Sequence, residues 1–278
     1  MSQFIAGKVI VVTGAAGGFG RLISLEAAAL GARMVCGDID SAGLAETIAK
    51  VRARGGQAEG LATDVTSLDQ MKALVALAVS AFGRIDVMIN NAGVMPLAFW
   101  ADHEAAAEQW SRCLDINIKG VMNGIIAAHD PMIGQGRGQV INVSSIYGNF
   151  PVAGAGVYGA TKAAVNFLSE SLRVESQGRI KVTTVRPTGV PATGLGGGVI
   201  NPAAIVGVLG QNTAPYLATM AALAAGEAAP GQTDADSVAY AALDPGHIAA
   251  AVIHAIDQPW GVSIGDITVR ASGDGYIL

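Results

Sequence analysis

The chain has 278 residues, of which 51% are hydrophobic and 14% charged, and its formal net charge is −5 at pH 7. This length allows a buried core in one or two domains, and the acidic balance argues against nucleic acid as a partner. No apolar run is long enough to span a bilayer, no charged leader opens the chain, and the four histidines lack metal-ligand spacing. Two distant cysteines indicate no disulfide framework. We therefore expect a cytoplasmic protein without a metal, a membrane or a nucleic-acid partner.

The first apolar run, residues 8–12, predicts a strand, and a glycine-rich turn and then a helix follow it. Gly14 would make the tight turn, Gly18 would let the backbone approach a pyrophosphate, and Gly20 would let the helix pack on the strand. Phe19 lies in the same loop, and the helix N-terminus would face the phosphates. Glycines alone fit any turn, but their place between strand and helix favours a dinucleotide site.

Asp38 ends the second predicted strand, 18 residues after Gly20. An acid at about this distance accepts hydrogen bonds from the adenosine ribose, and its charge would repel a 2′-phosphate. The nearest cations, Arg21 and Arg33, are interpreted as surface groups, although either could soften the preference. The pattern favours NAD as cofactor over NADP.

Two further strand ends carry candidate cofactor residues. Asp64 and Val65 follow the third predicted strand, where Asp64 could also cap the next helix. The turn Asn91-Ala92-Gly93 follows the fourth, fully apolar strand. Asparagine is common in any turn, but its place after a buried strand favours a specific role.

A tyrosine and a lysine four residues apart, Tyr158 and Lys162, would share one face of a predicted helix. A phenol with a pKa of about 10 is a poor proton carrier at neutral pH, but a nearby ammonium stabilises the phenolate. Ser145 ends a predicted strand 13 residues before Tyr158, so both hydroxyls could converge on one substrate oxygen. Ser144 lacks this spacing and is interpreted as structural. Asn117 stands within a predicted helix spanning residues 101–129, and asparagine has a low helix propensity, so its presence there needs a reason. The reason is either a role in the site or, as the alternative, a helix kink or a polar contact in the core.

These residues and the glycine loop resemble the short-chain dehydrogenase/reductase family over nearly the whole chain. The resemblance implies that Asp64 and Val65 line the adenine pocket and that the Asn91 turn lets the backbone approach the cofactor. It also implies that Asn117 holds a water linking Lys162 to solvent. Relatives assemble through the helices that contain Asn117 and Tyr158, so we expect a homo-oligomer, a dimer or a tetramer.

The chain departs from the family pattern after the sixth predicted strand. Pro187 is followed by Thr188 where the family usually has glycine, and Thr193 comes one place late. Val190 keeps the position whose backbone binds the nicotinamide carboxamide in the family. The roles of Thr188 and Thr193 stay open.

We predict one Rossmann-type α/β domain, residues 1–278, with a doubly wound, mostly parallel seven-stranded sheet in the order 3-2-1-4-5-6-7 and helices on both faces. Residues 191–243 are rich in glycine, alanine and proline and are interpreted as a substrate lid, with disorder as the alternative.

The resemblance implies an NAD-dependent oxidoreductase that interconverts a secondary alcohol and a ketone. Tyr158 would transfer the proton, Lys162 would lower its pKa and hold the nicotinamide ribose, and Ser145 would stabilise the alkoxide. An NAD-binding regulator without turnover, and a lyase or epimerase that uses NAD transiently, are the alternatives.

No lysine or arginine lies between Arg186 and Arg270, so we expect a neutral, largely hydrophobic small-molecule substrate. A short C-terminal match to relatives acting on 3-hydroxy acids argues the other way, and Arg112 or the glycines at 196–198 could still bind an anion. The expected wall residues are uncharged: Met95, Leu97, Ile146, Tyr147 and Phe150.

Overall fold

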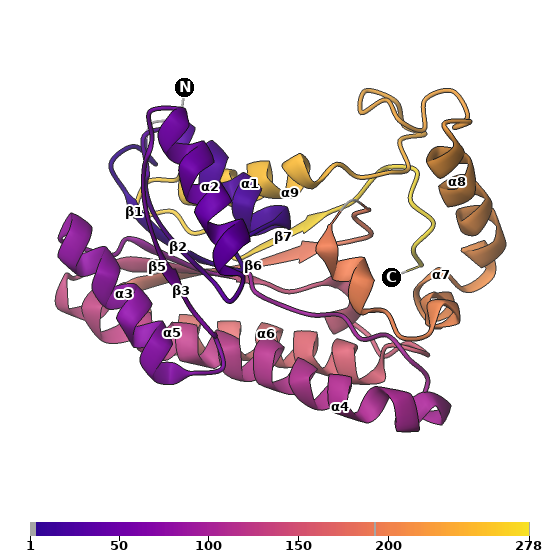
Figure 1. The fold of residues 1–278 in the computed structure, drawn as a ribbon, viewed down its shortest axis with the longest axis horizontal. Helices are drawn as coiled ribbons and strands as arrows, with labels where there is room; N and C mark the ends of the chain where they lie inside the picture. The colour runs from indigo at the N-terminus through magenta and orange to yellow at the C-terminus, as the bar shows by residue number, and fades with distance from the viewer. Residues whose placement is uncertain (1–3, 192, 278) are drawn as a thin grey trace.

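The computed structural model describes residues 4–191 and 193–277. The first three residues of the chain, residue 192 of the predicted lid and the last residue of the predicted domain therefore lie outside the described part. Seven strands form one sheet in the order β3-β2-β1-β4-β5-β6-β7 (Figure 1). The strands are β1 (Val9–Thr13), β2 (Arg33–Asp38), β3 (Gln57–Ala62), β4 (Val87–Asn90), β5 (Gly138–Val143), β6 (Ile180–Pro187) and β7 (Asp266–Val269). The predicted order is confirmed, and each pairing is parallel.

Helices cover both faces of this sheet (Figure 1), as predicted. One face is covered by α1 (Gly18–Ala29), α2 (Ser41–Ala53) and α9 (Pro245–Ile256). The other face is covered by α3 (Leu68–Phe82), α4 (His103–Leu114), α5 (Gly120–Gly134) and α6 (Gly156–Glu175). Within the described ranges, no helix combines the length and the apolar character that crossing a membrane requires.

The central strands are apolar along their length because both of their faces are covered. All five residues of β1 are buried, and successive side chains point to opposite faces of the sheet. Ile10 and Val12 join the core shared with α1, α2 and α9, whereas Val9 and Val11 join the core shared with α3 and α5. The strand order reverses between β1 and β4, and in parallel sheets a ligand crevice opens at the carboxyl ends of the strands at such a point.

The long helix predicted for residues 101–129 is interrupted. It begins at His103, and residues Asp115–Lys119 form a π-helical turn between α4 and α5. A π turn inserts one extra residue into the helix and re-aims the side chains after it. Asn117 lies in this turn and is buried, so the polar core contact considered for it is present.

The segment predicted as a lid has defined structure in its described residues rather than disorder. After several 3₁₀ turns it forms α7 (Val206–Leu209) and α8 (Thr213–Ala225). Figure 1 shows α8 standing apart from the sheet, and none of its residues is buried although its composition is apolar. Its predicted role in covering a substrate stays a proposal.

Candidate active site

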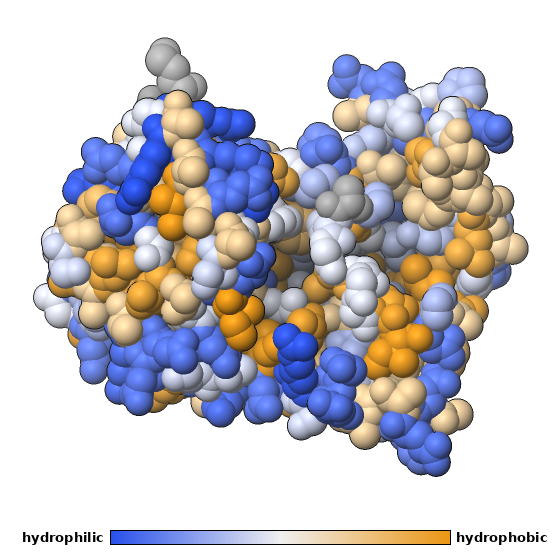
Figure 2. All heavy atoms as spheres, viewed as in Figure 1, coloured by the Kyte–Doolittle hydropathy of each residue, from blue (hydrophilic) through white to orange (hydrophobic). Residues whose placement is uncertain are grey.

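Two adjoining cavities open at the carboxyl ends of the strands. The larger has a volume of about 710 Å³ and the smaller about 520 Å³, and both are lined by Gly14, Asp38, Ala92 and Gly93. Figure 2 shows this face hollowed between the part that carries α1 and α2 and the part that carries α7 and α8. All the parallel strands end at this edge, so residues distant in sequence meet here.

The glycine loop between β1 and α1 is shaped by close backbone approaches. Gly14 has a φ of +67°, and a Cβ on it would come within 2.9 Å of the Ala92 Cα. A Cβ on Gly20 would collide with the Gly14 carbonyl oxygen. Gly18, in contrast, would meet nothing within 4 Å, and it lines the larger cavity at the start of α1. The first N–H groups of a helix lack partners within it, so this open space suits a phosphate group.

The turn after β4 fixes this loop. The Asn91 side chain donates hydrogen bonds to the carbonyl oxygens of Thr13 and Gly14, at 2.9 and 3.1 Å. The Asn91 N–H donates to the Thr13 hydroxyl at 3.1 Å. Ala92 and Gly93 then line both cavities. The turn therefore holds the glycine loop and also borders the space beside it.

Asp38 lies at the end of β2, between the two cavities. Its carboxylate accepts hydrogen bonds from the N–H groups of Ala16 and Asp40, at 2.8 and 2.9 Å, which hold it in place. The two cations considered near it are engaged elsewhere. Arg21 pairs with Glu46 at 2.8 Å, and Arg33 donates to the Gly7 carbonyl at 3.2 Å.

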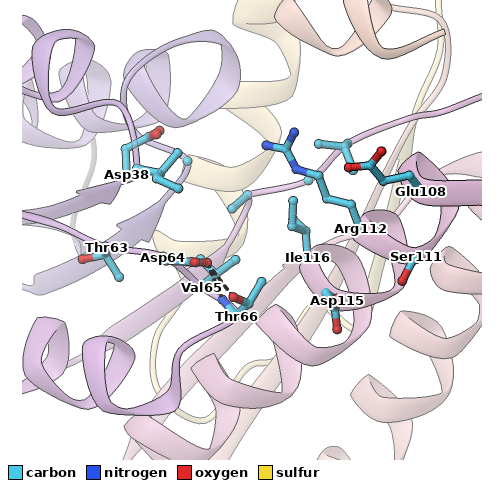
Figure 3. Close-up of a pocket in the computed structure, with 15 residues that line it drawn as sticks. Asp38, Thr63, Asp64, Val65, Thr66, Glu108, Ser111, Arg112, Asp115 and Ile116 are labelled. Carbon is cyan, nitrogen blue, oxygen red and sulfur yellow. Dashed lines mark hydrogen bonds between the residues drawn. The ribbon is translucent and has the colours of Figure 1, made fainter. Parts of the chain in front are cut away.

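Figure 3 shows the smaller cavity, which Asp64, Val65 and Ile116 border together with Asp38. The capping role considered for Asp64 is wrong, because Ser67 is the N-cap of α3. Asp64 instead accepts hydrogen bonds from the backbone and the hydroxyl of Thr66, at 2.9 and 2.8 Å.

Arg112 was not predicted as part of this cavity. Figure 3 shows its guanidinium, carried on α4, pointing into the space across from Asp38. It does not line the larger cavity, which holds Ser145 and Tyr158. Arg112 therefore belongs to the Asp38 side of the cleft rather than to the substrate side where we considered it. Arg112 lies in the last turn of α4, within the segment predicted as one long helix, and this position gave no sequence signal for the placement.

The four predicted catalytic residues come together, three of them in the wall of the larger cavity: Ser145, Tyr158 and Lys162. Tyr158 is only 2% exposed, and this burial raises its pKa, while a hydrogen bond from the Ser145 side chain acts in the opposite direction. Burial lowers the pKa of Lys162 to about 8. Its ammonium donates to the Val143 carbonyl at 2.9 Å and lies 5.8 Å from the centroid of the Tyr158 ring. In the chain alone, the expected lowering of the tyrosine pKa is therefore outweighed by burial.

Asn117 lies behind this wall and braces it. Its side-chain oxygen accepts a hydrogen bond from the Val94 N–H at 3.0 Å, and its side-chain NH₂ group donates to the Val94 carbonyl at 2.9 Å. The same amide reaches the Thr161 hydroxyl at 3.1 Å and the Cys113 sulfur at 3.2 Å. These contacts tie α4 and the loop after β4 to the residue preceding Lys162. Ser144 also braces the wall, because its hydroxyl donates to the Lys162 carbonyl at 3.2 Å.

The loop after β6 explains the departure from the family pattern. A Cβ on Gly189 would collide with the hydroxyl of Tyr276, so glycine is required one place later than in the family. Pro187, Thr188 and Val190 line the larger cavity beside it. The Thr188 hydroxyl oxygen is buried without a hydrogen-bond partner among the described residues, and the Thr193 hydroxyl donates to the Val190 carbonyl at 3.4 Å.

The remaining wall of the larger cavity is mostly apolar. Met95, Leu97 and Tyr147 lie in it as predicted, but Ile146 and Phe150 do not. The chain turns in a 3₁₀ helix directly after Ser145, which buries Ile146 in the core and leaves Phe150 63% exposed. Two tyrosines were missed: Tyr216 from α8 and Tyr276 from the C-terminal segment. Among residues 4–191 and 193–277, no cluster of three or more potential metal ligands is present.

Comparisons with known proteins agree with this architecture. A sequence model of the family described as short chain dehydrogenase matches residues 8–203. An uncharacterised oxidoreductase of Listeria monocytogenes is 35% identical over 268 residues, which cover 95% of this chain and 96% of the relative. The 2,5-dichloro-2,5-cyclohexadiene-1,4-diol dehydrogenase LinX of Sphingobium indicum is 36% identical over 192 residues, or 68% of this chain and 76% of the relative.

Solved structures give the same result. A short-chain dehydrogenase/reductase from Burkholderia phymatum in complex with NAD has a TM-score of 0.74 and 28% identity, covering 96% of this chain and 90% of the other. A metagenomic short-chain oxidoreductase in complex with NADP has a TM-score of 0.71 and 28% identity, covering 96% of this chain and 97% of the other.

Proposed function

The chain belongs to the short-chain dehydrogenase family of oxidoreductases, and we propose that it interconverts a secondary alcohol and a ketone with NAD(H). One observation carries the proposal: Ser145, Tyr158 and Lys162 line the same cavity as the open glycine loop at the start of α1. A phosphate-accepting helix end and a proton-transfer group thus border one continuous space. Both solved relatives named above are complexes with a nicotinamide cofactor.

The residues that would hold the cofactor follow from the cavity walls. Gly14, Gly18 and Phe19 would surround the phosphates, with Gly20 packed behind them against the Gly14 carbonyl, and Asp38, Asp64 and Val65 would contact the adenosine end. At the other end, Ala92, Gly93, Pro187 and Val190 would border the nicotinamide. Asn91 lines the larger cavity too, and it would also act through the loop that it fixes. The cofactor supplies the hydride chemistry.

The protein residues would move the proton and stabilise charge. Because burial raises the pKa of Tyr158, this residue is a neutral phenol at pH 7 and can donate its proton to the oxygen of a ketone. Ser145 would donate a hydrogen bond to the same oxygen as negative charge develops on it. In the oxidation direction Tyr158 must first lose its proton, and the ammonium of Lys162 favours the phenolate that results. The side-chain amide of Asn117 is already occupied by protein partners, so a water bound there would have to be held by its backbone carbonyl.

We propose NAD rather than NADP because a carboxylate at Asp38 would face a 2′-phosphate. Arg112 points into the cavity that Asp38 lines and is the one feature that favours the phosphorylated cofactor. Since Asp38 is held by two backbone N–H groups at the end of a strand, whereas Arg112 is on an exposed helix face, we give the carboxylate the larger effect.

The substrate that fits best is neutral. Among the described residues that line the larger cavity, Lys162 is the sole lysine or arginine, so no second cation is available for a carboxylate or a phosphate. LinX is named for a neutral diol, which agrees with this choice. The 191–243 segment contributes Thr193, Leu195, Tyr216 and others to the same walls, which supports its proposed role as a lid.

We also propose that the protein assembles as a homo-oligomer in the cytoplasm. Large apolar side chains on α5 and α6 are exposed in the single chain: Met122, Ile126, Phe167 and Val174. Phe167 is the most exposed of these, at 77%, and an apolar patch of this kind marks an association surface.

The experiment is a spectrophotometric screen of NADH and NADPH with neutral ketones, and of NAD and NADP with the matching alcohols. Net, stoichiometric oxidation of NADH with formation of the alcohol supports the proposal. A regulator would bind the cofactor without turnover, and an epimerase or lyase would convert substrate with no net change in NADH. Either of these results would overturn it.

A further inference from the structure

Two tyrosines from separate parts of the chain meet in the wall of the larger cavity, which also contains Ser145 and Tyr158. Tyr216 comes from α8 and Tyr276 from the segment after β7. Their hydroxyl oxygens are 3.1 Å apart, and their ring centroids are 5.7 Å apart. A polar pair thus lies in a wall that is otherwise mostly apolar, and it comes from elements other than those that carry the catalytic hydroxyls.

The pair has hydrogen-bonding capacity left over. Two phenols carry two protons, and the bond between them uses one. Neither hydroxyl has another hydrogen-bond partner among the described residues, so one O–H group can still donate into the cavity. The Tyr276 hydroxyl donates to that of Tyr216, so the O–H group of Tyr216 is the one left to donate, and burial raises the pKa of Tyr276, which keeps that phenol neutral in the bond. A partly buried donor without a partner is costly, and a ligand that accepts its hydrogen bond removes that cost.

The position of Tyr276 is fixed from both sides. Its carbonyl oxygen accepts a hydrogen bond from Arg270 at 2.8 Å, and the next residue, Ile277, donates to the Val208 carbonyl of α7 at 3.0 Å. Asn212 donates to the Gly275 carbonyl at 2.9 Å. On the other side the Tyr276 hydroxyl lies against Gly189, in the loop that ends with Val190. The hydroxyl pair is therefore a held feature of the wall rather than a free surface group.

The surroundings define what the pair can bind. The cavity that the pair lines is walled largely by apolar side chains, including Met95, Leu97, Val199, Pro202, Ile205 and Leu217, and its remaining hydroxyl groups include those of Tyr147, Thr188 and Thr193. No lysine or arginine other than Lys162 lines this cavity in the described chain, so an anion would lack a counter-charge. An uncharged oxygen, in contrast, needs a single donor.

We propose that Tyr216 and Tyr276 recognise a second, uncharged oxygen of the substrate, so that the preferred substrate is a neutral ketone or alcohol with a further carbonyl or hydroxyl group away from the reacting carbon. This inference rests on the proposed function, and it adds a specificity determinant to it. A substrate without the second oxygen would still react but would leave the donor unpaired. Sites built to bond a polar group discriminate against analogues that lack it.

The test compares matched ketones that differ in the distal oxygen: cyclohexanone with cyclohexane-1,4-dione, and 2-decanone with 2,9-decanedione. Values of kcat/KM with NADH, corrected twofold for the two equivalent carbonyls, give a dione preference for each pair. We expect a preference of about tenfold in at least one pair, the size of one hydrogen bond to a neutral donor. Tyr216→Phe and Tyr276→Phe should each reduce this preference to about threefold or less.

Leu217→Met is the matched control, because it alters the same wall without adding or removing a donor. It should keep the wild-type preference, and NADH affinity should be the same in all variants. A wild-type enzyme that reduces ketones with no dione preference in either pair would overturn the inference. So would a preference that survives in both phenylalanine variants. If no ketone is reduced with either cofactor, the proposed function itself fails, and the inference with it.

Discussion

The side chain of Asp38 offers a direct test of cofactor choice. Asp38→Asn keeps the shape of the side chain and removes its charge. In the structure the carboxylate accepts from two backbone N–H groups, at 2.8 and 2.9 Å, and an asparagine can keep one of these bonds with its single oxygen. The variant should therefore lose about 1 kcal/mol of stability rather than NADH affinity, because the lost bond lies within the protein and is present with or without cofactor. Its main effect should be on a cofactor that carries a 2′-phosphate.

The size of that effect follows from the charges. Two like charges about 4 Å apart repel by about 1 kcal/mol in water and by about 4 kcal/mol near a protein surface. Asp38 is partly buried, so the true value should lie between these limits. Even the lower limit, about 1 kcal/mol, makes the ratio of the NADPH and NADH dissociation constants fall by about fivefold in Asp38→Asn, and about 2 kcal/mol makes it fall about thirtyfold. The double change Asp38→Ala with Ile39→Arg should shift the ratio further, because it adds a cation.

Dissociation constants measured by calorimetry make this test independent of the unknown substrate. Asp40→Asn is the matched control: it removes the same charge two residues away, from a side chain that caps α2 and lines neither cavity. Its cofactor ratio should stay within about twofold of wild type, because its charge is exposed and screened. A wild-type protein that prefers NADPH, or equal shifts in the two variants, would refute the assignment of Asp38.

Three further predictions concern stability and assembly. Burial lowers the pKa of Lys8 from 10.5 to about 8, so between pH 8 and 9 the unfolded chain holds more protons than the folded chain, and the free energy of unfolding rises with pH. In urea unfolding, Lys8→Met should reduce the slope of this free energy against pH by up to about 1.4 kcal/mol per pH unit, and an unchanged slope would contradict the prediction. Gly189→Ala places a Cβ against the hydroxyl of Tyr276 and should lower the free energy of unfolding by about 1 to 3 kcal/mol. In Gly261→Ala the new Cβ meets nothing within 4 Å, so this control should lose less than about 0.5 kcal/mol, and equal losses would count against the packing of Tyr276 on Gly189. Phe167→Glu should disrupt the α6 surface and so lower the mass measured by sedimentation. Val238→Glu changes an exposed apolar position outside α5 and α6 and should leave that mass unchanged, and a wild-type protein that sediments as a monomer would refute the proposed assembly.

The fold could be predicted because the sequence signals are local and agree with one another. Strands such as β1 and β4 are short, fully buried and apolar up to a polar last residue, and a turn that contains glycine follows each of them. Parallel alternation of strands and helices then leaves few possible orders. Gly14, Asp38 and Ser145 were all found because each lies at or within two residues of the end of a strand, so the topology brings them to one edge.

The missed features depend on long-range contacts or on single-residue shifts in helical pitch. The π turn around Asn117 adds one residue within a continuous helical pattern, which hydrophobic periodicity cannot reveal. Tyr216 and Tyr276 are 60 residues apart and meet only because the C-terminal segment crosses α7. Their meeting also explains why glycine stands at position 189, a departure that the sequence showed but could not account for.

The central claim is that Tyr158 transfers the proton, and two neighbouring tyrosines allow it to be tested directly. Tyr147 lines the same cavity, and its ring centroid is 5.5 Å from that of Tyr158. The measurement is kcat for Tyr158→Phe and Tyr147→Phe with the best ketone from the screen, together with the dissociation constant for NADH. We predict a loss of at least about a hundredfold in kcat for Tyr158→Phe with unchanged NADH affinity, and a loss of less than about tenfold for Tyr147→Phe. Near-native turnover in Tyr158→Phe, or equal losses in the two variants, would contradict the claim.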